Sequence, residues 1–270
     1  MTNRNKTVKF LLATTAAIAL GSASPALAQD MWVSVEGGKS AMTTSNSYYS
    51  NEIDGYSGSY YDTGTISGTG NNLAFEAGIN FADSPYSLSI GARSSSEGHT
   101  YYYDQYVDEV SFTTLDFEVG RDVSLGGSAT GRLTLGVRSA SVNASGTNYY
   151  GYYNGSTEFG GVGPRIALEA SIPVMDRVSF DVEAGAAILF GTTSNNTNGY
   201  YGTSYTDSGS TTVTNLDFSA AVSYLIGSKS KVSLGYRYEK FDGIDGYNYA
   251  SGYVDSVEDQ GAFLKFTTRF

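Results

Sequence analysis

Charged side chains recur at every second position in many short segments of this chain, and the positions between them are apolar. In one such segment Asp116 and Glu118 alternate with Leu115, Phe117 and Val119. Carboxylates, guanidinium and ammonium groups that share one surface can neutralise each other as ion pairs, and an excess of carboxylates favours the passage of cations. The chemistry these residues offer is therefore electrostatic. The set has nine acidic and six basic members: Glu36, Glu76, Arg93, Asp116, Glu118, Arg132, Arg138, Arg165, Glu169, Asp181, Glu183, Asp217, Arg237, Glu239 and Lys265.

Strict alternation identifies the elements that carry these charges. Successive side chains of a β-strand point to opposite faces of the sheet, so a period of two predicts strands. Counting segments from about 31–40 to about 260–270 gives ten strands. We expect short turns at 83–85, 124–128, 173–177 and 226–230, and long loops near 41–71, 96–108, 143–157, 191–212 and 242–258.

Composition excludes several classes of protein. The net charge is −11 and the pI is about 4.5, so the chain has no surface suited to nucleic-acid phosphates. The absence of Cys excludes disulfides and thiolate chemistry. A content of 33 Gly and 23 Tyr suits a β-protein with many turns and an aromatic surface.

The N-terminus predicts export. Arg4, Lys6 and Lys9 precede an apolar stretch at 10–20, and small residues follow at 26–28. This order is typical of a signal peptide, and the apolar stretch is well below the roughly 20 residues that span a bilayer as a helix. We therefore expect residues 1–28 to be a cleaved signal peptide and 29–270 to form a single domain.

Alternating long and short connections predict an antiparallel transmembrane outer-membrane β-barrel, with short periplasmic turns and long extracellular loops.

The chain ends with Leu264, Phe266 and Phe270 on one face. A terminal aromatic residue in this pattern resembles the assembly signal read by the barrel-assembly machinery. The expected partners are this machinery, outer-membrane lipid and lipopolysaccharide. A secreted β-sandwich also alternates, but charges on nearly every strand and tyrosines near strand ends favour the membrane barrel.

Several stretches resemble the Legionella-type major outer-membrane protein family. They are the segments at 161–170, GVGPRIALEA, at 185–191, GAAILFG, at 115–120, LDFEVG, and at 261–266, GAFLKF. This resemblance implies a pore-forming barrel. General porins have sixteen or more strands, however, so a wide channel is not expected from a chain of this size.

The sequence leaves two functions open for the barrel and places an adhesin second. With the charged set lining the lumen, the protein is either a small, weakly cation-preferring, porin-like channel or a structural surface protein with a salt-bridged lumen, because barrels of about eight strands are filled by side chains. The alternative is an adhesin that binds through its Tyr/Gly-rich loops, where Tyr pairs such as those at 48–49 and 149–150 occur.

Enzyme activity is a remote alternative. His99 is the sole histidine, in a segment predicted as a loop with Asp104 nearby. Acid–base chemistry needs a base held beside a nucleophile or an activated water. The Asp-x-His pattern of ten-stranded outer-membrane proteases does not occur.

The segment at 242–248, DGIDGYN, has oxygen ligands without EF-hand spacing, and its Asp-Gly pairs predict turns. We expect no enzyme, cofactor or metal.

Overall fold

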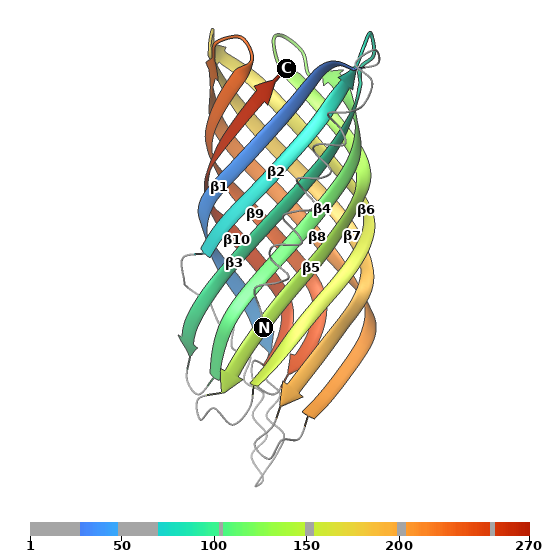
Figure 1. The fold of residues 1–270 in the computed structure, drawn as a ribbon, viewed down its shortest axis with the longest axis vertical. Helices are drawn as coiled ribbons and strands as arrows, with labels where there is room; N and C mark the ends of the chain where they lie inside the picture. The colour runs from blue at the N-terminus through green and yellow to red at the C-terminus, as the bar shows by residue number, and fades with distance from the viewer. Residues whose placement is uncertain (1–27, 48–69, 103–104, 149–153, 199–203, 249–251) are drawn as a thin grey trace.

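The protein folds as an all-β barrel in a computed structural model that describes residues 28–47, 70–102, 105–148, 154–198, 204–248 and 252–270 (Figure 1). The predicted signal peptide falls outside these residues except for Ala28, which begins the first strand. The described residues contain no helix that could cross a membrane. The ten strands are β1 (Ala28–Ser47), β2 (Gly70–Phe81), β3 (Tyr86–Tyr102), β4 (Gln105–Ser124), β5 (Thr130–Asn148), β6 (Asn154–Met175), β7 (Val178–Asn198), β8 (Ser204–Ile226), β9 (Ser230–Asn248) and β10 (Gly252–Arg269).

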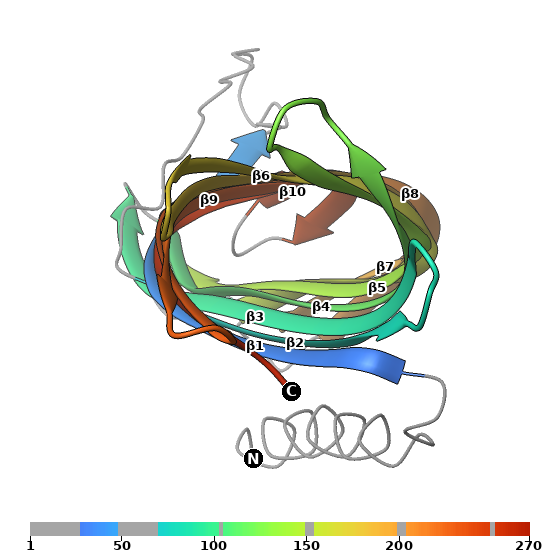
Figure 2. The same cartoon turned by 90° about the horizontal axis from the view of Figure 1, so that it is seen from above.

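The sheet closes on itself. Every strand pairs antiparallel with its neighbours in sequence, and β1 pairs with β10 from Trp32↔Arg269 to Ser47↔Tyr253. Figure 2, which looks along the barrel, shows the resulting ring. Closure lets the backbone groups of the first and last strands bond each other, as hydrocarbon surroundings require. The predicted ten-stranded antiparallel barrel is therefore confirmed.

Alternating side chains give the barrel an apolar outer face. On β4, Leu115, Phe117 and Val119 are each about half exposed, whereas Thr114 and Glu118 between and beside them are buried. The same pattern of outward aliphatic and aromatic side chains continues on β5–β8. A closed band of this kind is what lipid-facing strands present.

Short connections gather at one end of the barrel, here called the turn end. They occupy 82–85, 125–129, 176–177 and 227–229, close to the predicted turns. Gly126, Gly127 and Gly227 adopt positive φ, where L side chains are strained. Strand β1 begins and β10 ends here, and the backbone nitrogen of Phe270 donates to the Met31 carbonyl at 2.8 Å.

The opposite end, here called the loop end, differs from the prediction. Most residues expected in long loops are strand: β3 runs to Tyr102, β4 starts at Gln105, and β7 runs to Asn198. The composition explains the difference, because Tyr and Thr favour strands and antiparallel pairing can continue beyond a membrane. The Tyr pairs at 48–49, 60–61, 149–150, 152–153 and 200–201 lie outside the described residues.

Strand β9 bends inward near the loop end. Its pairing with β8 stops at Thr214↔Asp242, while its pairing with β10 continues to Asn248. Gly243 and Asp245 have φ of +87° and +49°, so the Asp-Gly pairs predicted as turns form a bulge within a strand. Beyond the bulge, the Ile244 carbonyl accepts a 2.6 Å hydrogen bond from Thr193 of β7. The end of the β9–β10 hairpin thus reaches inside the ring (Figure 2).

Candidate functional site: the barrel interior

All fifteen charged residues singled out from the sequence line the inside of the barrel. Thirteen surround a mid-barrel cavity of only about 70 Å³. Arg132 and Asp181 line a second cavity of about 710 Å³ at the turn end. The smaller volume holds no more than a few water molecules. The larger one also carries aromatic walls from Trp32 and Phe263.

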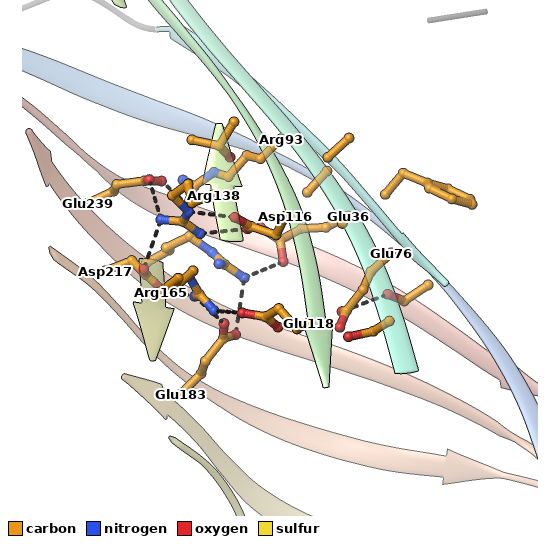
Figure 3. A pocket seen from close by; sticks show the side chains of 18 of the residues that line it. Glu36, Glu76, Arg93, Asp116, Glu118, Arg138, Arg165, Glu183, Asp217 and Glu239 are labelled. Carbon is orange, nitrogen blue, oxygen red and sulfur yellow. Dashed lines mark hydrogen bonds and ion pairs between the residues drawn. The ribbon is translucent and has the colours of Figure 1, made fainter. Parts of the chain in front are cut away.

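Arg138 of β5 lies at the centre of the charged network (Figure 3). Its Nε and Nη2 donate to the two carboxylate oxygens of Asp116, each at 2.7 Å. Its Nη1 faces the far wall, where it is 3.0 Å from Asp217 Oδ2 and 3.3 Å from Glu239 Oε1, and it also donates to Asn215. The guanidinium can satisfy several acceptors at once because its five N–H groups form a fixed fork.

Arg165 of β6 extends the network toward the turn end. It pairs with Glu118 of β4, with Asp217 Oδ1 at 2.8 Å and with Glu183 at 3.5 Å. Asp217 therefore bridges Arg138 and Arg165, using one carboxylate oxygen for each. Such bridging compensates buried charges for the water they have lost.

Two further arginines tie the first and last strands into the network. Arg93 of β3 pairs with Glu239 at 2.8 Å and with Asp259 of β10 at 3.1 Å. Arg237 of β9 pairs with Glu36 of β1 at 2.9 Å. Both guanidinium groups also lie over aromatic rings: Arg93 is 5.6 Å from the Phe112 centroid, and Arg237 is 5.3 Å from that of Phe263.

The remaining charged residues pair locally nearer the turn end. Lys265 meets Glu76 at 3.1 Å, Lys231 meets Asp181 at 2.7 Å, and Arg132 meets Asp122 at 2.7 Å. Glu169 differs from them. It stands opposite Arg132 in the β5–β6 ladder and opposite Glu183 in the β6–β7 ladder, and none of the ion pairs among the described residues includes it. The network thus gathers most of the predicted residues but leaves this carboxylate aside.

An apolar cluster fills the interior on the loop side of the network. Its side chains are almost fully buried and come from seven strands and from the inward end of β9. Sequence analysis predicted a polar interior, so this cluster is a correction. The physical reason is that a ten-stranded barrel is narrow enough for large side chains from opposite walls to meet. Its members are Met42, Val110, Phe112, Ala140, Val142, Ala144, Phe159, Ala187, Leu189, Val213, Phe241, Ile244, Val254 and Val257.

The sequence signal for the missed residues was present. Phe112 is an even number of residues from Asp116 on the same strand, as Phe241 is from Glu239, so each pair shares one face of its strand. Extending the alternation beyond the charged residues therefore places both rings inside the barrel. Asp259 shares the phase of Lys265, and Lys231 shares that of Arg237. Asp259 escaped prediction because β10 begins at Gly252, within the segment expected to be a long loop.

The residues considered for catalysis and metal binding have these positions. His99 belongs to strand β3 rather than to a loop, and its side chain and Asp104 lie outside the described part of the structure. Within the described ranges, no group of three or more His, Asp or Glu side chains is placed to hold a metal ion.

A closed, ten-stranded antiparallel barrel with an apolar outside and a filled interior defines an integral outer-membrane β-barrel protein. The chain belongs to the family described as Legionella pneumophila major outer membrane protein precursor, whose sequence profile matches residues 47–245. This confirms the resemblance found in the sequence and places the protein in the bacterial outer membrane. A comparison with curated protein sequences found no relative.

Solved structures of outer-membrane barrels resemble this one. The outer membrane protease OmpT from Escherichia coli superposes with a TM-score of 0.56 at 11% identity, covering 90% of this chain and 97% of that chain, and so supports the fold. A major outer membrane protein from Thermus thermophilus gives a TM-score of 0.45 at 13% identity, covering 89% and 99%. The likeness to OmpT extends to the barrel architecture alone.

Proposed function

We propose that this protein is a non-conducting structural barrel that holds extended strand ends at the cell surface. The observation that carries the proposal is that two successive layers fill the cross-section. The ion-pair network occupies the middle, with a residual cavity of about 70 Å³, and the apolar cluster occupies the loop side.

Conduction through this interior would require both layers to open. Arg138, Asp217 and Glu239 are each at most 5% exposed at the side chain. Separating one member of a buried ion pair from its partners costs roughly 3–5 kcal/mol, because an uncompensated charge is left behind. An apolar ring beyond the charges adds a second barrier, since such constrictions exclude water. The turn-end cavity of about 710 Å³ would then be a closed pocket that the two layers separate from the loop end.

Planar-bilayer conductance of the folded protein tests this proposal. Heat-modifiable migration on gels first confirms that the barrel has formed. We expect no conductance steps from the wild-type protein. Stable, salt-dependent steps with cation preference would overturn the proposal and establish the porin-like channel instead.

A variant with smaller interior side chains tests whether the absence of conductance is due to the filled lumen. Phe112→Ser together with Phe241→Ser removes two rings whose centroids lie 5.1 Å apart. The matched control is Phe117→Ser with Phe218→Ser, where both rings are about half exposed on the outer face. Each pair is combined with Arg138→Ser, which opens the charged layer as well. We then expect conductance steps from the inner pair of substitutions and none from the outer pair.

A further inference from the structure

Strand β8 has a free edge at the loop end. Residues Ser204–Val213 pair with β7 on one side. On the other side, the β8–β9 ladder begins only at Thr214↔Asp242. Among the described residues, no backbone hydrogen bond reaches 204–213 from that side. Alternate residues of this ten-residue segment therefore direct unpaired N–H and C=O groups to the free side.

The inward bend of β9 creates this edge. Thr211 Oγ1 donates to the Gly243 carbonyl at 3.1 Å, which marks the point where the two strands part. From Ile244 onward β9 packs toward β6 and β7 inside the barrel, where Ile244 is 1% exposed. Because burial of Ile244 holds β9 in the lumen, the natural neighbour of β8 is not available to cover the edge.

The edge is accessible and lacks the usual protection. Every residue of 204–210 is exposed, so both faces of the strand end are open, and Tyr205 is 65% exposed. Proteins commonly guard such edges with Lys, Pro or a bulge. Residues 204–213, SYTDSGSTTV, contain no Lys or Pro, and the nearby bulge lies in β9.

Charge indicates what kind of strand fits. Asp207 on the edge and Asp242 and Asp245 on the neighbouring strand are exposed. On the loop side of the network, the described strand residues carry only two basic side chains, Lys39 and Lys240. Lys240 already meets Asp242 and Glu258, each at 3.3 Å. The surroundings of the edge are thus acidic, and they attract a basic partner.

We infer that an extended, basic peptide segment of a partner protein adds to the β8 edge at Ser204–Ser210 as an antiparallel strand. Backbone hydrogen bonds provide the affinity, and basic side chains at alternate positions reach Asp207 and Asp242. The inference rests on the proposed function only in placing the loop end outside the cell.

Fluorescence anisotropy with a defined peptide tests the inference. The probe is a labelled peptide of about ten residues with alternating Lys and Thr, added to the protein in zwitterionic nanodiscs. The control peptide has the same sequence with N-methyl groups on alternate residues, which keeps the charge and blocks one strand edge. We expect the control to bind at least about tenfold more weakly.

Two protein variants locate the site. Asp207→Lys places a basic side chain on the edge and should weaken binding by about tenfold or more. Asp176→Lys makes the same change in charge at the exposed turn end and should leave binding unchanged.

The possible outcomes separate this inference from the proposed function. Equal binding of both peptides, equal effects of both variants, or a Kd weaker than about 1 mM would each overturn strand addition. A barrel that conducts and still binds the peptide at Asp207 contradicts only the closed-lumen proposal. A silent barrel that does not bind the peptide contradicts only the inference.

Discussion

Arg93 of β3 and Glu239 of β9 belong to well-separated walls of the barrel, and their side chains meet at 2.8 Å inside it. Arg138 of β5 approaches the same carboxylate at 3.3 Å from a third direction. These contacts are cross-braces between strands that share no backbone hydrogen bonds. They fix the width of the barrel as well as its charge balance.

Replacing the central guanidinium should destabilise the barrel strongly. Arg138→Ala leaves Asp116, Asp217 and Glu239 without a shared partner, and we expect a loss of roughly 3–5 kcal/mol. Arg132→Ala is the control, since its partner Asp122 is 55% exposed at the side chain and a loss of about 0–1 kcal/mol is expected. Urea unfolding in lipid vesicles measures both. Equal losses would contradict the central role of Arg138.

Adjacent positions of β6 test the assignment of inner and outer faces. Leu168 is 44% exposed on the outer face, and we expect Leu168→Arg to cost roughly 2–4 kcal/mol in a bilayer. Glu169→Gln changes the next residue, which faces the turn-end cavity between Arg132 of β5 and Glu183 of β7. That variant should fold with a small change in the free energy of unfolding. Comparable losses at the two positions would show that the faces are wrongly assigned.

Two glycines of β6, Gly163 and Gly160, differ in the space available for the methyl group of an alanine. A Cβ on Gly163 would lie 1.7 Å from the Ile188 carbonyl oxygen of β7, a backbone atom that cannot move alone. We expect Gly163→Ala to cost about 1–3 kcal/mol or more through displaced strands. Gly160→Ala meets nothing within 4 Å and should stay within about 0.5 kcal/mol of wild type. Thermal unfolding of the two variants provides the comparison.

The C-terminal aromatic residue should matter more for assembly in the cell than for the folded barrel. Phe270 is 66% exposed and contributes one backbone bond, to Met31. We therefore expect Phe270→Ala to lower the amount of heat-modifiable barrel in outer-membrane fractions and to refold in vitro like wild type. Phe190→Ala, a 57% exposed ring far from the terminus, is the control. A parallel loss for Phe190→Ala would argue against an assembly signal.

Alternation in the sequence was enough to predict the strands and their inner and outer faces. It works because one face meets lipid and the other does not, so Phe117 and Glu118 could be assigned to opposite sides. The inner face alone was harder to divide into charged and apolar layers. Phe159 and Leu189 share the inner face with Arg165 and Glu183, but their meeting in one apolar cluster depends on barrel width, which is a property of the closed sheet and not of either strand.

Contacts between distant strands could not be predicted at all. Nothing local relates Arg237 to Glu36, which are 201 residues apart, or Arg93 to Asp259, which are 166 apart. The inward course of β9 escaped prediction for a similar reason. The segment at 242–246, DGIDG, has the composition of a turn, and only the burial of Ile244 among residues of other strands selects a bulge.

The bridge between Glu36 and Arg237 also sets an order of events during biogenesis. Glu36 belongs to the first strand and Arg237 to the ninth, so the carboxylate has no partner until nearly the whole sheet is present. The charges on the inner face of the growing sheet must therefore stay hydrated. They can lose this water only when β1 pairs with β10 and the barrel closes. Contacts with such large sequence separation form slowly and late. Unfolding must separate β1 from β10 and rehydrate the same charges before any strand can dissociate. We therefore expect the folded barrel to persist chiefly because its unfolding rate is low.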